Sequence, residues 1–234
     1  MNLMTKETPM TNIECPRSVE ESLRKTIGIR ASAFVIPSSF VIPPITLGVA
    51  ILSLALMCSA NLSEILQFDR EAVAAGQLWR VVTGHFTHWN LDHLFWDGVV
   101  FAVLGVLCER RQRGRFMLCL TAAAVLIPAS VWLLLPELNT YRGLSGLDTA
   151  LFTMLAGSIL AEKWAAREWR WVTIIAGLMI GLGSKIAFEV FTQGTMFVDT
   201  VTANFQPVPL AHVVGALAGI VVAMLPELRA PAGT

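Results

Sequence analysis

The chain has 234 residues and a formal net charge of zero, from 17 basic and 17 acidic side chains. Hydrophobic residues make up 55% of it and charged residues only 15%, whereas soluble domains carry roughly 25% charged residues. These figures exclude a soluble globule and a disordered chain, and the lack of a basic excess argues against a nucleic-acid partner. The composition therefore predicts an integral, multi-pass protein embedded in a lipid bilayer.

Six segments are long and apolar enough to cross a bilayer, which takes about 20 mostly apolar residues. In chain order they are Phe40–Ala60, Leu91–Cys108, Phe116–Leu135, Leu144–Ala161, Trp171–Phe191 and Val208–Leu225. The fold class that we predict is an all-α membrane protein, a bundle of six transmembrane helices. The prolines Pro37, Pro43 and Pro44 mark the start of the first helix, because proline is tolerated in the first turn and not in the interior.

The predicted spans form one domain, residues 40–226. Residues 1–39 precede it as a cytoplasmic N-terminal tail with the segment that leads into the membrane, and residues 227–234 follow as a short cytoplasmic tail. Cytoplasmic loops carry an excess of Lys and Arg. With the N-terminus inside, the inner segments hold thirteen of these residues and the outer segments three. Both termini are therefore expected in the cytoplasm, and the protein in the cell (inner) membrane of a bacterium.

Polar residues gather at the outer ends of the predicted spans. Ser145 lies about two residues into the fourth span and His212 about four residues into the sixth. At a rise of 1.5 Å per residue, both lie roughly 3–6 Å below the outer boundary of the bilayer. A serine and an imidazole at one depth can act as a nucleophile and its general base if their helices are neighbours.

Small residues beside Ser145 and His212 favour this interpretation. Glycines flank the serine, while Gly215 and Gly219 share the helix face of His212. Such a Gly-x-x-x-Gly surface lets another helix approach closely, and Ser145 meets His212 if that helix is the fourth span. The alternative is that Ser145 caps its helix, that His212 is a hydrogen-bonded packing residue, and that the glycines serve packing only.

The second span carries a cluster of its own. His93 and Asp97 lie at i and i+4, so they share a helix face, and His88 precedes them. The cluster suits the stabilisation of an anion or, with His85 and Asp92, a metal site. The metal alternative requires both preceding histidines and Asp92 to converge, which happens only if the segment between them is helical.

Three further ionisable residues lie within the predicted spans, where each needs an explanation. Lys185 and Glu189 are four residues apart near the outer end of the fifth span. We expect them to pair with each other, and the alternative is that they line a water-filled cavity or a gate. Asp148, one turn after Ser145, either orients a partner or accepts a hydrogen bond from the backbone.

Four segments, in order, resemble the motifs of the rhomboid family of intramembrane serine proteases. They are Trp79-Arg80, the pattern of His88, His93 and Asp97, Gly143-Leu144-Ser145-Gly146, and the run from Ala211 to Gly219. The resemblance covers roughly Gln77 to Met224. It implies a rhomboid-like bundle of six helices that cleaves transmembrane segments of membrane-anchored proteins near the outer face, with no cofactor and no metal.

The resemblance also implies the role of each residue. Ser145 is the nucleophile and His212 the general base, with no third acid expected. The oxyanion site takes its donors from His93, from the position of Asp97 and from the backbone N–H of the serine, and it is supported by His88 and Gly143.

Two positions depart from the family pattern. Asp97 stands where the family has asparagine, and an ionised carboxylate accepts hydrogen bonds but donates none to an oxyanion. A protonated Asp97 would donate, whereas an ionised Asp97 would orient His93. Thr149 stands where family members often have a tyrosine that stacks on the histidine.

Two other functions stay open on the sequence. One is a rhomboid-like protein that binds transmembrane helices without cleaving them, which Asp97 favours. The other is a metal-dependent membrane enzyme or transporter that uses the His and Asp cluster. Within the family, the compact six-span chain also resembles the rhombosortases, the subgroup associated with C-terminal sorting tails.

Overall fold

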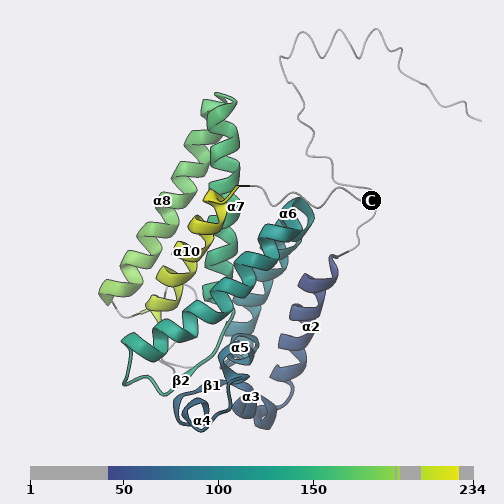
Figure 1. Cartoon of the computed structure of the whole chain (residues 1–234), viewed down its shortest axis with the longest axis vertical. Coiled ribbons are helices and arrows are strands. Elements are labelled where there is room, and N and C mark those ends of the chain that lie inside the picture. Colours follow the sequence, from purple (N-terminus) through teal and green to yellow (C-terminus); the bar gives the residue numbers. More distant parts are fainter. Residues whose placement is uncertain (1–41, 193, 196–206, 227–234) are drawn as a thin grey trace, which may run out of the picture. The chain divides into compact units, whose positions relative to one another are not determined.

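The computed structural model describes residues 42–192, 194–195 and 207–226, so both predicted tails, 1–39 and 227–234, lie outside the described residues. The described chain is almost entirely helical (Figure 1). Its elements are α2 (Pro44–Met57), α3 (Ala60–Leu66), β1 (Phe68–Asp69), α4 (Arg70–Ala74), α5 (Arg80–Thr83), the 3₁₀ helix η1 (Gly84–Phe86), α6 (Leu91–Leu134), β2 (Thr140–Tyr141), α7 (Ser145–Ala165), α8 (Trp169–Thr192) and α10 (Pro209–Met224).

The long α6 is two helices joined at one residue, Gln112, whose φ of −150° and ψ of 69° are not helical. Just before this break, Arg111 pairs with Glu162 in the last turns of α7. The two ends of α6 lie at the other end of the bundle. Asp97 bonds the backbone at the start of α7, and carbonyls in the last turn of α6 bond Arg70. The chain therefore reverses direction at Gln112, between the second and third predicted spans.

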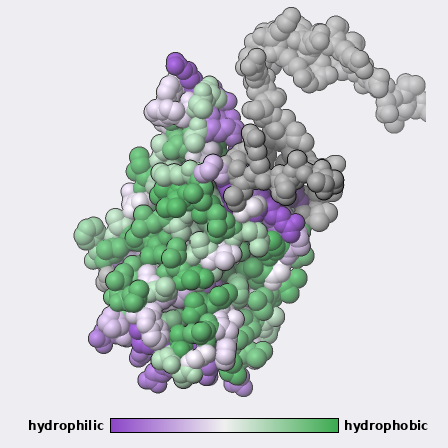
Figure 2. All heavy atoms as spheres, viewed as in Figure 1, coloured by the Kyte–Doolittle hydropathy of each residue, from purple (hydrophilic) through white to green (hydrophobic). Residues whose placement is uncertain are grey.

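All six predicted spans correspond in position to helices, namely α2, the two halves of α6, α7, α8 and α10. The first of them begins at Pro44, as the prolines predict. By length and composition, α6 and α8 are the described helices that can cross a membrane singly, and α2 with α3, bent by 119°, gives a third candidate. Figure 2 shows a broad hydrophobic band with hydrophilic residues toward both ends, as expected of a protein within a bilayer.

The closest helix contact is between α7 and α10. A Cβ on Gly215 would lie 2.1 Å from the Gly146 carbonyl oxygen, and a Cβ on Gly219 would lie 2.1 Å from that of Ala150. Thr153 adds a hydrogen bond to a carbonyl of α10 at 3.1 Å. The glycine surface of the sixth predicted span thus packs on the backbone of the fourth, which is the condition that the sequence left open. This contact holds the N-terminal turns of α7 beside α10.

Residues 61–90, between the first two predicted spans, hold most of α3 and all of α4, α5 and η1. Arg70 fastens this segment by donating to four carbonyls, those of Val131, Trp132, Leu135 and Leu138. Arg80, from the Trp-Arg motif, donates to two carbonyls within the segment itself. β1 pairs antiparallel with β2, just before α7. Residues 61–90 are therefore bonded to the end of α6 and to β2, which lead into the candidate site.

Glu109, in the first half of α6, caps the N-terminus of α2. Its Oε2 accepts hydrogen bonds from the backbone N–H and the hydroxyl of Thr46, at 2.9 and 2.8 Å, and Oε1 accepts from Ile45 at 3.3 Å. A carboxylate is favourable at a helix N-terminus because it satisfies free N–H groups and complements the helix dipole. Twelve residues separate it from Asp97, about 18 Å along the helix. Glu109 is therefore a structural acid.

Candidate active site

Gly143 brings the start of α7 against the cluster on α6. Its φ is +119°, and a Cβ there would lie 2.9 Å from His93 Nε2 and 3.0 Å from Asp97 Oδ2. Glycine adopts this conformation without strain and leaves the space free. Leu144 and Ser145 follow directly, with Ser145 as the first residue of α7. The backbone N–H groups at the helix start are thereby turned toward Asp97.

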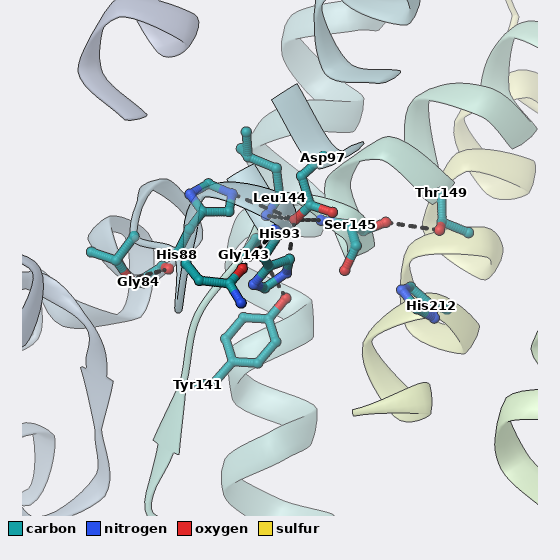
Figure 3. Close-up of polar contacts among 12 residues, drawn as sticks. Gly84, His88, His93, Asp97, Tyr141, Gly143, Leu144, Ser145, Thr149 and His212 are labelled. Carbon is teal, nitrogen blue, oxygen red and sulfur yellow. Dashed lines mark hydrogen bonds and ion pairs between the residues drawn. The ribbon is translucent and has the colours of Figure 1, made fainter. Parts of the chain in front are cut away.

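Four nitrogen atoms surround one oxygen of Asp97 (Figure 3). Oδ2 accepts hydrogen bonds from the backbone N–H of Leu144 at 2.9 Å and of Ser145 at 3.1 Å. His93 Nε2 lies 3.2 Å and His88 Nε2 lies 3.4 Å from the same oxygen. These contacts favour Asp97 as a hydrogen-bond acceptor over Asp97 as a donor. The nitrogen atoms form an anion-binding site, and the carboxylate of Asp97 occupies it.

His212 lies in the first turns of α10, beside Ser145 in Figure 3. The two residues line the same cavity. His212 Nε2 is buried and has no hydrogen-bond partner among the described residues, so it is not bonded to Ser145 Oγ in this structure. Hydrogen bonds between a nucleophile and its base are often long without substrate and tighten when substrate binds.

The other nitrogen of His212 contacts an acid that was not among the predicted site residues. Glu189 Oε2 lies 2.7 Å from His212 Nδ1, and Glu189 Oε1 lies 2.9 Å from Lys185 Nζ. The expected Lys185–Glu189 pair is thus confirmed, but it is also joined to His212 and lines the cavity. The resemblance implies no third acid, whereas the structure has a carboxylate in contact with His212. In the sequence, Glu189 is marked only by its position near the predicted outer end of the fifth span, at a depth similar to that of His212.

A cavity of about 600 Å³ joins these groups between α6, α7, α8 and α10. Ser145 and His212 lie on its walls with Glu189. Much of the lining is apolar, from Trp96, Val100, Leu104, Phe152, Leu178 and Leu182. On α8, Gly177 and Gly181 line it, and nothing lies within 4 Å of a Cβ placed on either. The cavity therefore suits an apolar peptide segment with its backbone close to Ser145.

Two residues of α7 complete the wall behind Ser145. The hydroxyl of Thr149 donates to the Ser145 carbonyl oxygen at 2.8 Å. Asp148 is buried, lines the cavity, and has an Oδ1 with no hydrogen-bond partner among the described residues. Thr149 therefore forms a hydrogen bond within its own helix, and it has no aromatic ring that could stack on His212.

The condition for the metal alternative is not met. Asn90 is extended, with φ −154° and ψ 177°, so the segment between the histidines and Asp92 is not helical. Burial lowers the pKa of His85 to about 4, and its neutral ring donates from Nε2 to the Ala124 carbonyl at 3.1 Å. In the part of the chain that the structure describes, no three His, Cys, Asp or Glu residues are placed to hold a metal ion.

A family model for the Rhomboid domain matches residues 75–226, well over half of the chain. The chain belongs to the rhomboid family. It is accordingly an integral membrane protein of a family whose members are generally intramembrane serine proteases acting on transmembrane substrates. A search of curated proteins finds no match. Every residue of the candidate site lies within the range of this rhomboid domain.

Proposed function

We propose that this rhomboid is an active intramembrane serine endopeptidase with Ser145 as nucleophile and His212 as general base. The observation that carries the proposal is the backbone contact of α7 with α10. It brings Ser145 to the same cavity as His212, whose Nε2 has no hydrogen-bond partner among the described residues. Helix packing needs only the glycines, and buried polar atoms without a partner are rare unless they have a function.

The proposed reaction begins when His212 Nε2 takes the proton of Ser145 Oγ as that oxygen attacks the scissile carbonyl. The oxyanion that forms lies against the N–H groups of Leu144 and Ser145, beside His93, once the carboxylate of Asp97 has moved out. His212 then gives its proton to the leaving amine, and water hydrolyses the acyl-enzyme by the same steps in reverse roles.

The proposal includes six spans with both termini in the cytoplasm, in the cell membrane of a bacterium, and a single membrane domain over residues 40–226. The distribution of Lys and Arg supports this orientation. The substrates are transmembrane segments of membrane-anchored proteins, and they unwind near the outer face because helical hydrogen bonds shield the scissile carbonyl. The resemblance to rhombosortases makes C-terminal membrane-anchored tails the first substrate class to assay.

A second candidate function is a rhomboid that binds transmembrane helices without cleaving them. One observation favours it, which is that the Asp97 carboxylate fills the site that an oxyanion needs. If Asp97 never leaves, the domain keeps its cavity and its lateral binding of helices but loses its chemistry.

The test uses the full chain in liposomes, with tagged transmembrane reporters and a serine-reactive phosphonate probe. We expect cleavage near the outer face, chelator-independent labelling of Ser145, and a loss of at least about 10³-fold in kcat for Ser145→Ala and for His212→Ala. Circular dichroism checks that both variants stay folded. Near-normal turnover in either variant refutes the dyad. Binding of reporters with neither labelling nor cleavage establishes the second candidate, and cleavage in the inner third of the span contradicts the proposed depth.

A further inference from the structure

We infer that Glu189 is a positioning residue for His212. The site of this rhomboid then consists of three residues, Ser145, His212 and Glu189, where the family has a dyad of serine and histidine. The inference rests on the proposed function, and it concerns the base rather than the nucleophile.

The contact that carries the inference is short and buried. Glu189 Oε2 lies 2.7 Å from His212 Nδ1, in the range of charge-assisted hydrogen bonds. The side chain of Glu189 is 2% exposed and that of His212 is 10% exposed. A carboxylate buried to this extent needs partners for both oxygens. Lys185 Nζ, 2.9 Å from Oε1, supplies the second partner.

This contact selects the ring nitrogen that carries the proton. When Nδ1–H donates to Glu189, Nε2 keeps its lone pair, which is the form that a general base requires. Nε2 is also the nitrogen that is buried without a partner among the described residues. Lys185 Nζ lies 3.3 Å from Nδ1, but an ammonium cannot accept the Nδ1 proton and it has the closer Glu189 oxygen to bond.

The surroundings of His212 explain why a separate group has this role here. Thr149 stands where family members often have a stacking tyrosine, and its hydroxyl is used by the Ser145 carbonyl. Glu189 instead reaches the ring from α8. It is one of three buried residues of that helix, and the other two, Val172 and Ile175, lie in its first two turns. The second half of α8 therefore contacts α10 through Glu189 and His212, the proposed general base.

Glu189 acts after the proton transfer as well as before it. When His212 takes the proton of Ser145, the ring becomes an imidazolium, and the buried carboxylate of Glu189 at Nδ1 stabilises that charge. The gain applies to the chemical step and not to substrate binding. Loss of the carboxylate should consequently lower kcat and leave KM nearly unchanged.

The test compares kcat and KM of Glu189→Gln with those of the wild-type chain on the same reporter in liposomes. Glutamine keeps the shape and an acceptor oxygen but removes the charge. We expect kcat to fall about 10²- to 10⁴-fold, the scale for losing the acid of a triad, with KM within about threefold. Glu109→Gln is the matched control. It removes another buried carboxylate with three hydrogen bonds, and it should lower Tm while leaving kcat normal.

A second variant separates positioning from folding. Glu189→Gln leaves the partly buried Lys185 without its carboxylate, and loss of the partner of such a charge destabilises a fold. Lys185→Met/Glu189→Gln removes both charges, so it should regain Tm and keep the low kcat. Recovery of kcat along with Tm overturns the inference. So does a raised KM with unchanged kcat, which would mean that Glu189 merely fastens α8.

Failure of the inference is distinguishable from failure of the proposed function. If Glu189→Gln keeps wild-type kcat while Ser145→Ala is inactive, Glu189 has no positioning role and the protease activity stands. If Ser145→Ala itself still cleaves the reporter, the proposed nucleophile is wrong whatever Glu189 does.

Discussion

Asp97 and the substrate need the same N–H group. The backbone N–H of Ser145 donates to the Asp97 carboxylate at 3.1 Å, and in the proposed reaction it must donate to the oxyanion instead. A negative carboxylate beside a developing oxyanion is also repulsive. In the proposed reaction, each turnover therefore begins with displacement of Asp97 from a site in which two backbone groups and two imidazoles surround it.

Replacing this carboxylate with an amide should speed up the enzyme. We expect Asp97→Asn to raise kcat/KM about 10- to 100-fold, because asparagine carries no charge and can donate to the oxyanion, and one such donor is worth about 10²–10³ in kcat. The measurement is reporter cleavage in liposomes. The double variant Ser145→Ala/Asp97→Asn must be inactive if the gain passes through Ser145. A clear loss of activity in Asp97→Asn would instead mean that the charge is needed to orient His93.

The site residues differ in how far the sequence predicts them. Ser145 and His212 are predictable because each sits in a run of small residues at a span end, and His93 with Asp97 because helical spacing puts them on one face. Glu189 is not predictable as a partner of His212. The two residues lie on different helices, and the approach of α8 to α10 depends on packing that leaves no local period in the sequence.

At the scale of elements, the contact of α7 with α10 should tolerate no added atom. In Gly215→Ala, the new Cβ would lie 2.1 Å from a backbone oxygen that cannot rotate away. We expect a loss of about 1–3 kcal/mol in stability and a fall in kcat, because Ser145 and His212 separate with their helices. Thermal unfolding and reporter cleavage measure the two effects.

Gly183→Ala is the control for that experiment. A Cβ at Gly183 meets nothing within 4 Å, so both Tm and cleavage should stay near the wild-type values. An unchanged Tm in Gly215→Ala would contradict the backbone contact on which the candidate site depends.

The glycines of α8 give a separate prediction about substrate access. Gly181→Leu places a large side chain in the cavity, and Gly183→Leu adds the same side chain on the same helix at a position that is not part of the cavity lining. We expect Gly181→Leu to lower cleavage of the transmembrane reporter at least about tenfold, since apolar side chains cannot overlap a bound segment.

Labelling by the small phosphonate probe distinguishes exclusion of substrate from damage to the site. Ser145 should still be labelled in Gly181→Leu, and Gly183→Leu should keep both labelling and cleavage. Equal cleavage by the two variants would show that the segment does not bind against α8.

The helices themselves were largely predictable, because a bilayer imposes long apolar runs that are easy to find in a sequence. The predicted spans leave residues 109–115 between the second and third helices, yet helical backbone continues on both sides to the single break at Gln112. The short helices of residues 61–90 were not predicted. Their arrangement depends on distant carbonyls bonded by Arg70, and such long-range hydrogen bonds leave no pattern within the segment.

For the whole molecule, the proposed orientation predicts which turns face the outside. Single cysteines at Ala75→Cys and Ala166→Cys, both exposed positions, are introduced after the four native cysteines are replaced with serine. A membrane-impermeant maleimide should label Ala75→Cys in intact cells, and Ala166→Cys only after the membrane is opened, because basic residues stay in the cytoplasm. The reverse pattern would place both termini outside.

α8 lines the cavity and also carries Glu189, the acid that contacts His212. Only Val172, Ile175 and Glu189 are buried along its described length. A substrate that displaced α8 on entering against this wall would also move Glu189 away from His212. Observed turnover would then be the intrinsic rate multiplied by the fraction of molecules with Glu189 at His212, so a substrate that leaves about one molecule in ten in that arrangement would be cut about tenfold more slowly. Such an enzyme would discriminate between substrates by the rate of cleavage after they have bound.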